Sequence, residues 1–195
     1  MSKKVVYLTG APSTGKSTLT ANLALALPDI KIFAYSAKLL DWMNKKIPTL
    51  TSREDLRKSS AQLVTREDIN KVDQLLLDLV ATERETTNIV IDSHPVTIEK
   101  FGFRITPFSK AQINQLKPDV IVCLYAAPEI IHERISKDNA GRMIPTLDEL
   151  GVHMSLQAQV ANLYAFETGA SLYFLDTNSQ PSELLDRFLR VTKLT

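Results

Sequence analysis

The chain of 195 residues is long enough for one compact domain, and 44% hydrophobic against 23% charged residues is typical of a soluble globular protein. Its 23 basic and 22 acidic residues leave a formal net charge of +1, so no overall field attracts nucleic acid or an anionic membrane. We therefore expect no nucleic-acid partner and no membrane partner. The first apolar stretch is too short for a signal peptide, and no segment approaches the ~20 apolar residues of a membrane span. These features predict a cytoplasmic protein.

Five apolar runs of strand length recur along the chain. Most are unbroken rather than alternating, which is typical of strands that are covered on both faces of a parallel sheet. The runs are 4–10, 31–35, 88–93, 119–125 and 171–177. The helical patterns between and after them are 16–27, 52–85, 127–137, about 146–168 and 181–193. This alternation predicts right-handed β-α-β crossovers and one α/β domain over 1–195, with a five-stranded, mostly parallel sheet flanked by helices.

The long helical pattern at 52–85 predicts two helices rather than one, because it holds two possible starts. Ser52 with Asp55, and Thr65 with Asp68, have the spacing of a capping box in which Asp replaces the usual Glu.

The stretch GAPSTGKST at 10–18 directly follows the first predicted strand and opens the first predicted helix. Gly10, Gly15, Lys16 and Ser17 match the phosphate-loop pattern G-x-x-x-x-G-K-[ST] in full. The glycines let successive backbone N–H groups turn into one concavity that holds phosphate oxygens at a helix N-terminus. Lys16 can follow the β- and γ-phosphates of ATP, and the Ser17 hydroxyl can bind Mg²⁺. The residues predicted to hold ATP are Gly10, Ala11, Pro12, Ser13, Thr14, Gly15, Lys16, Ser17 and Thr18.

A second Mg²⁺ ligand is expected at the end of another strand. Asp92 follows three apolar residues in the run 88–93, and it can hold Mg²⁺ together with Ser17, directly or through water. The next residue is Ser93, where motor-type ATPases usually place a water-activating Glu. This difference disfavours futile hydrolysis of ATP and favours transfer of its phosphoryl group to another acceptor.

The phosphate loop, the strand that ends in DSH at 92–94 and a later arginine-bearing loop together resemble the archaeal-type adenylate kinases, a branch of the P-loop nucleoside monophosphate kinases. The similarity covers most of the chain, and the shared order and spacing of the segments carry it. The segments are KKVVYLTGAPSTGKSTLT, EDLRK (54–58), IDSHPVT, LKPDVIVCL (116–124) and ANLYAFETGASLYFLDTN (161–178).

The resemblance implies a three-layer P-loop NTPase fold with a short lid loop. Acceptor-binding helices are expected at about 36–86 and the lid at about 136–146. The implied activity is reversible transfer of the γ-phosphoryl group of ATP to AMP or a related nucleoside monophosphate with Mg²⁺. The family is often trimeric, so a homo-oligomer stays open for this chain, although no interface can be identified from its residues.

Three residues are candidates for binding the acceptor. Arg57 lies in the segment 54–58, where the family binds the acceptor phosphate. Arg104 lies in the expected loop after the Asp92 strand; many nucleotide kinases place an acceptor-binding arginine there, but the archaeal-type pattern has an apolar residue near this position. His94 matches the histidine of the family, and it can hydrogen-bond the acceptor, orient Asp92 or be structural.

The resemblance also points to catalytic arginines that act with Lys16. The lid of the family carries two closely spaced arginines, whereas here only Arg142 stands in the matching place. Either Arg134 supplies the second charge from the preceding helix, or the donor or acceptor differs. An arginine aimed at the transferring group can contribute roughly a thousandfold or more in rate.

Two aromatic residues fall in or near the expected acceptor region. Trp42 and Tyr35 could stack on a base, but we expect both to pack in the core.

Two other functions stay open. The chain could be a P-loop kinase for another small acceptor, such as a deoxynucleotide, a sugar acid or a vitamin precursor, because the acceptor depends on side-chain geometry. It could also be an ATP-dependent switch or assembly factor with slow ATPase activity. Dependence of ATP turnover on an added monophosphate separates these alternatives.

Overall fold

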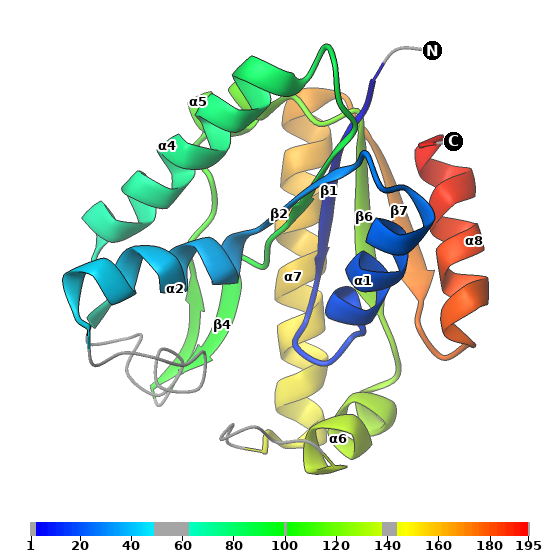
Figure 1. Ribbon diagram of the computed structural model, residues 1–195. Helices are drawn as coiled ribbons and strands as arrows, with labels where there is room; N and C mark the ends of the chain where they lie inside the picture. Colours follow the sequence, from blue (N-terminus) through cyan, green and yellow to red (C-terminus); the bar gives the residue numbers. More distant parts are fainter. Residues whose placement is uncertain (1–2, 49–62, 100, 138–143, 195) are drawn as a thin grey trace.

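The computed structural model of the protein describes residues 3–48, 63–99, 101–137 and 144–194. At its centre is one sheet of five parallel strands in the order β2-β3-β1-β6-β7 (Figure 1). The strands are β1 (Val5–Gly10), β2 (Lys31–Ala34), β3 (Ile89–Asp92), β6 (Val120–Tyr125) and β7 (Ser171–Asp176). The ends of each strand lie within one residue of a predicted run, so the predicted α/β fold with its five-stranded sheet is confirmed.

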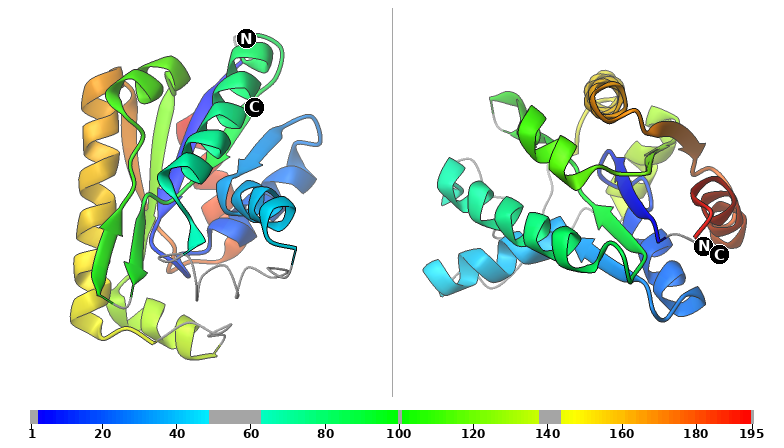
Figure 2. Two further views of the ribbon diagram at one scale, coloured as in Figure 1. Left: turned by 90° about the vertical axis from the view of Figure 1, so that its left-hand side faces the viewer. Right: turned by 90° about the horizontal axis from the view of Figure 1, so that it is seen from above.

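Helices cover both faces of the sheet, which gives three layers (Figures 1 and 2). Successive residues of a strand point to opposite faces. Accordingly, Val6 and Leu8 of β1 pack with α1 (Lys16–Ala26) and α8 (Pro181–Thr192). Val5 and Tyr7 face the other side, where the covering helices are α4 (Arg66–Glu83), α5 (Lys110–Leu116) and α7 (Leu147–Thr168). Among the helices that the structure describes, none combines the length and the apolar character that crossing a bilayer requires.

The sequence analysis left the helix after β2 without bounds, and it missed a short hairpin and the short helix α5. Helix α2 (Tyr35–Lys46) starts directly after β2, and α6 (Pro128–Lys137) follows β6 close to its prediction at 127–137. Strands β4 (Val96–Glu99) and β5 (Gly102–Ile105) form an antiparallel hairpin where a loop was expected. Each hairpin strand has only four residues, and α5 has seven, so neither shows a clear hydrophobic period.

Parallel pairing brings the carboxyl ends of the central strands to one edge of the sheet. Leu8 pairs with Asp92, and Asp92 also pairs with Ala34 at the end of β2. On the other side of β1, Gly10 pairs with Leu124. The phosphate-loop segment, Asp92 and the start of α2 therefore meet at the same edge.

Helix α4 begins at the capping box that the sequence predicts. The Thr65 side chain accepts a hydrogen bond from the Asp68 backbone N–H, and the Asp68 carboxylate accepts one from the Thr65 backbone N–H. The predicted cap at Ser52 and Asp55 lies outside the described residues.

Asp68 also joins α4 to α2. Its side chain is almost fully buried, at 2% exposure. Its Oδ1 accepts hydrogen bonds from Trp42 Nε1 (3.0 Å) and Lys46 Nζ (2.9 Å). Burial alone would raise the pKa of Asp68, but the hydrogen bonds from Trp42, Thr65 and Lys46 outweigh it and hold the pKa well below its usual value of 3.8. The carboxylate is thus charged in the folded protein, and Trp42 has the core position expected for it.

Replacing Asp68 by Asn removes this charge with little change of shape. We expect Asp68→Asn to lower the free energy of unfolding at pH 7 by ~2 kcal/mol, because a charged hydrogen-bond network is lost. The folded-state pKa lies below the unfolded value, so the charge stabilises the fold above about pH 4 and this stabilisation is lost as the pH falls through the folded pKa. Urea unfolding at pH 7 and pH 3, followed by circular dichroism, should show the difference shrinking at the lower pH.

Asp78→Asn is the matched control, because Asp78 is exposed on the same helix and its carboxylate accepts a hydrogen bond only from Gln74 among the bonds described for it. We expect it to change the free energy of unfolding by less than ~0.5 kcal/mol. Equal losses for the two variants, or a loss for Asp68→Asn that does not change with pH, would contradict the role of the charge.

Candidate active site

The phosphate-loop segment leaves β1 in a backbone conformation that suits glycine. Gly10 has φ +148°, and a Cβ atom there would lie 2.6 Å from the carbonyl oxygen of Leu124 and 2.8 Å from Thr14 Oγ1. Gly15 has φ +86° at the N-cap of α1. Between them, Thr14 Oγ1 donates a hydrogen bond to the carbonyl oxygen of Ala11 at 2.7 Å. The loop thus folds back on itself and places the N-terminus of α1 directly after it, as the motif predicts.

Lys16 lies over this loop. Its Nζ donates hydrogen bonds to the carbonyl oxygens of Gly10 (2.5 Å) and Ala11 (3.1 Å). The positive charge is therefore held at the loop and next to the N-terminus of α1, two features that both favour an anion.

Ser17 and Asp92 line one hollow, as the sequence predicted for a shared metal site. The hollow has a volume of about 310 Å³, and its other walls are Thr20, Ala21, Ile32, Ala34 and Ser36. Hydroxyl and carboxylate oxygens are the ligands that Mg²⁺ prefers, and Mg²⁺ usually takes only one or two protein ligands beside phosphate oxygens and water. The donor set therefore fits Mg²⁺. Within the described part of the chain, no three His, Cys, Asp or Glu side chains gather to form a metal cage.

Arg134 reaches the phosphate loop from α6. Its guanidinium donates hydrogen bonds to the Thr177 hydroxyl (3.0 Å), the Thr177 carbonyl (2.8 Å) and the Ser13 carbonyl (3.4 Å). Arg134 thus connects the loop to the segment after β7. Arg142, the other predicted lid arginine, lies outside the described residues.

Of the three predicted acceptor-binding residues, only one lines a pocket in the described part of the chain. Arg104 lies in β5 rather than in a loop, and its Nη1 pairs with Glu99 Oε1 across the hairpin at 3.4 Å. Arg57 lies outside the described residues. His94 lines a second pocket, next to the hollow of Asp92.

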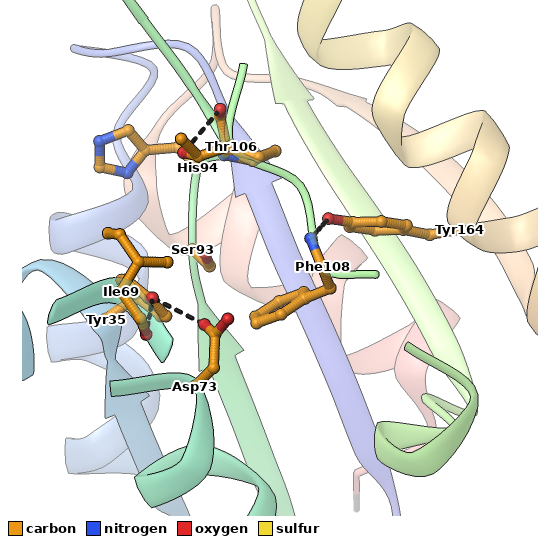
Figure 3. Close-up of a pocket in the computed structure, with 9 residues that line it drawn as sticks. Tyr35, Ile69, Asp73, Ser93, His94, Thr106, Phe108 and Tyr164 are labelled. Carbon is orange, nitrogen blue, oxygen red and sulfur yellow. Dashed lines mark hydrogen bonds between the residues drawn. The ribbon is translucent and has the colours of Figure 1, made fainter. Parts of the chain in front are cut away.

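This second pocket is the feature that sequence reasoning missed. The start of α2, the inner face of α4, the segments after β3 and before α5, and the C-terminal part of α7 meet at it (Figure 3). Its cavity volume is about 30 Å³, which is room for about one water molecule. Its lining residues are Tyr35, Ile69, Asp73, Ser93, His94, Pro95, Thr106, Phe108 and Tyr164.

Asp73 is the acidic group of this pocket. Its Oδ1 accepts a hydrogen bond from the Tyr35 hydroxyl at 2.7 Å, and its Oδ2 accepts one from Gln112 Nε2 at 2.9 Å. Burial raises the pKa of Asp73 although both hydrogen bonds favour its charged form. The signal in the sequence was an acidic residue within the buried stripe of α4, beside Val72 and Leu76.

Aromatic side chains form the wall next to Asp73. Phe108 packs edge-on against Tyr35, with ring centroids 6.2 Å apart, and its backbone N–H donates to the Tyr164 hydroxyl at 2.7 Å. Tyr35 therefore packs in the core, as expected, and also lines the pocket with its polar end.

Helix α7 contacts the residue before the phosphate loop and the first residue of the β4–β5 hairpin. Gln157 Nε2 donates a hydrogen bond to Thr9 Oγ1 at 2.6 Å, one residue before the phosphate loop. His153 Nε2 lies 3.0 Å from the Val96 carbonyl oxygen, at the start of the hairpin. Burial lowers the pKa of His153, and the positive charge of Lys16 lowers it further. The hydrogen bond with Val96 raises this pKa but does not outweigh the two other effects. We therefore expect the His153 imidazole to be neutral.

The sequence matches a family model and several curated proteins. The model described as "AAA domain" matches residues 9–150. An adenylate kinase of Pyrobaculum aerophilum is 25% identical over 177 residues, which cover 90% of this chain and 86% of that protein. An adenylate kinase of Thermococcus kodakarensis is 26% identical over 196 residues, with 97% and 95% covered. The predicted resemblance to archaeal adenylate kinases is confirmed.

Two solved structures share the fold. A sugar kinase of Janibacter sp. HTCC2649 superposes with a TM-score of 0.59 at 20% identity, covering 99% of this chain and 96% of that one. A shikimate kinase of Acinetobacter baumannii in complex with shikimate superposes with a TM-score of 0.61 at 14% identity, covering 97% and 92%. At these identities the likeness concerns the fold alone.

The close approach at Gly10 can be tested against a helical glycine in the same chain. We expect Gly10→Ala to lower the free energy of unfolding by more than ~1 kcal/mol and to weaken ATP binding, because the new Cβ meets Leu124 and Thr14. Gly151→Ala in α7 meets no atom within 4 Å and should stabilise the protein by ~0.5–1 kcal/mol. Thermal unfolding and calorimetric ATP titration measure both effects, and shifts of the same sign would contradict this geometry.

Proposed function

Because the chain belongs to the AAA domain family and is a P-loop kinase, an ATP-dependent phosphotransferase, we propose that it transfers the γ-phosphoryl group of ATP to a nucleoside monophosphate, with AMP as the preferred acceptor. The single observation that carries this proposal is the position of the pocket. Ser93 and His94 line it and directly follow Asp92, which lines the hollow beside Ser17. Consecutive Cα atoms are about 3.8 Å apart, so the two spaces are neighbours.

On the donor side, the loop amides and Lys16 hold the phosphates of ATP, and Ser17 and Asp92 hold Mg²⁺. A bound Mg²⁺ neutralises charge on the β- and γ-phosphate oxygens. The chain's own part is to fix the phosphates in line with the acceptor. Lys16 already lies at the loop, and this position lets its charge move from the carbonyl oxygens of Gly10 and Ala11 to a phosphate.

On the acceptor side, the acceptor lies beside Ser93 and His94, and its phosphate points toward Asp92. Arg57 binds this phosphate by analogy with the resembling kinases, and Arg142 closes over the transferring group. Arg104 is a weaker candidate for phosphate binding, because Glu99 already pairs with it. His94, at the border of the two spaces, contacts the acceptor.

A phosphate acceptor also fits the presence of Ser93, rather than a carboxylate, directly after Asp92. The second ionisation of a phosphate monoester has a pKa near 6, so its oxygen is a ready nucleophile at pH 7. Ser93 rather than a carboxylate follows Asp92, and little is therefore present at that position to activate water. Positioning and charge neutralisation then supply most of the catalysis.

A second candidate acceptor is a small polyhydroxylated molecule, which Asp73 favours. A hydroxyl acceptor needs a base within hydrogen-bond reach, and the Asp73 carboxylate lines the acceptor pocket. In that case Asp73 would remove the proton of the attacking hydroxyl, and its loss would abolish turnover with every acceptor.

The proposed function predicts ATP consumption that depends on an added monophosphate. With Mg²⁺ and AMP, we expect stoichiometric ADP formation that stops in excess chelator. Lys16→Ala should reduce the rate by about 100-fold or more, since it removes a charge from the transferring phosphates. Arg142→Ala should also slow it strongly. A coupled assay against AMP, the other monophosphates, deoxynucleotides, gluconate and shikimate measures these rates.

Lys3→Ala is the matched control. Lys3 is exposed and precedes the amino end of β1, whereas the phosphate loop follows its carboxyl end. We expect it to leave the rate unchanged. Slow ATP turnover that ignores every monophosphate would overturn the proposal in favour of a switch, and turnover only with gluconate, shikimate or a related compound would favour the second candidate.

A further inference from the structure

Two polar side chains lie on the buried face of α7, one helical turn apart. His153 is fully buried and Gln157 is 1% exposed. Residues four positions apart share one face of a helix, so both belong to the face that covers the sheet. The other buried residues of this helix are Leu150, Val160, Ala161 and Tyr164. A buried amide loses its water and regains only what its protein partners supply, so packing alone does not account for Gln157.

The partner of Gln157 is the last residue before the phosphate loop. Gln157 Nε2 donates a hydrogen bond to Thr9 Oγ1 at 2.6 Å, across 148 positions of the chain. Thr9 is fully buried, and its backbone pairs with Cys123 of β6 inside the sheet. Gln157 Oε1 has no hydrogen-bond partner within the part of the chain that the structure describes. Among the described bonds, the contact with Thr9 is therefore the one that holds this amide.

The backbone just after Thr9 needs support from outside the loop. Gly10 leaves β1 with φ +148°, and it has no side chain that could fix this conformation. Its carbonyl oxygen accepts a hydrogen bond from Lys16 Nζ at 2.5 Å. A change in the direction in which the chain leaves Thr9 therefore moves the amides of the loop and the position of the Lys16 charge.

Helix α7 gives this contact a rigid base. It has 22 residues and runs along the sheet (Figure 1). A capping box between Thr146 and Glu149 closes its first turn, and Gly169 ends it in the left-handed conformation. Gln157 lies in the middle of the helix, away from both ends. Sites that are held by hydrogen bonds from rigid elements keep their geometry most precisely.

We propose that Gln157 is a positioning residue for the donor site. Its hydrogen bond to Thr9 fixes the direction in which the chain enters Gly10, and it thereby sets where the phosphate loop and Lys16 hold the phosphates of ATP. Gln157 acts through Thr9 and not by contact with ATP. This inference rests on the donor half of the proposed function and does not depend on the identity of the acceptor.

The direct test is Gln157→Leu, which removes the hydrogen bond and keeps a similar side-chain volume. We expect the Kd for ATP with Mg²⁺ to rise about tenfold and the KM for ATP to rise with it, because the loop amides no longer converge on the phosphates. The KM for AMP should change less than twofold. Calorimetric titration with ATP and steady-state kinetics measure these values.

Val160→Ala is the control that separates positioning from stability. Val160 is buried on the same helix and packs in the core. The variant should lower the urea midpoint of unfolding, because it leaves a cavity, and it should keep the Kd for ATP within twofold of the wild-type value. A loss of ATP affinity as large as that of Gln157→Leu would overturn the positioning role.

Two variants of Thr9 test the other end of the same hydrogen bond. Thr9→Ser keeps the hydroxyl and should bind ATP within about threefold of the wild type. The isosteric Thr9→Val has no acceptor atom and should bind ATP about tenfold more weakly. Combining Thr9→Val with Gln157→Leu should weaken binding little further, because both changes remove one interaction. The two Thr9 variants decide the matter even if Gln157→Leu does not fold.

The outcomes separate this inference from the proposed function. Wild-type ATP affinity in a folded Gln157→Leu protein, or losses that add up in the double variant, overturns the role of Gln157. A wild type that binds ATP but phosphorylates no monophosphate overturns the proposed acceptor, and a tenfold higher Kd for ATP in Gln157→Leu then still supports the positioning role. A wild type that binds no ATP overturns the donor half of the proposed function and this inference with it.

Discussion

A parallel sheet delivers the last residue of every strand to the same edge, and the whole candidate site of this protein depends on that constraint. Because Leu8 pairs with Asp92 and Asp92 with Ala34, the phosphate loop, the candidate metal ligand and the start of α2 come together although they lie far apart in the sequence. The same edge carries Ser93 and His94 into the acceptor pocket. Site chemistry at the carboxyl ends of parallel strands is a general property of open α/β sheets. In the proposed function, the donor side lies on β1 and the acceptor side on β3.

The fold was largely predictable because its signals are local. Unbroken apolar runs are sufficient to place five buried parallel strands, and the loop motif fixes the first crossover without any knowledge of the rest of the chain. The capping box at Thr65 is likewise a pattern of four residues. The hairpin β4–β5 and the short α5 were missed because four to seven residues are too few to show a period. Arg104 was consequently expected in a loop, whereas the structure pairs it with Glu99 across the hairpin.

The acceptor pocket could not be predicted, because its contacts are long-range. Tyr35 meets Asp73 across 38 positions, and Gln112 meets it across 39. Neither pair is visible in a local pattern, although an aspartate on the buried stripe of α4 was a sign that a partner must exist. Asp68, on the same helix, shows how a similar carboxylate behaves in a structural role: it has a cation and a cap as partners, and its pKa is lowered. Asp73 has only neutral partners within the bonds described for it, and burial raises its pKa.

Transfer of a labelled phosphoryl group tests the central claim most directly. The purified protein is mixed with Mg²⁺, AMP and ATP labelled in the γ-phosphate, and the products are separated by chromatography. The account predicts that the label moves to the β-phosphate of ADP formed from AMP, with little free inorganic phosphate. Label that appears only as inorganic phosphate, at the same rate with and without AMP, would contradict it.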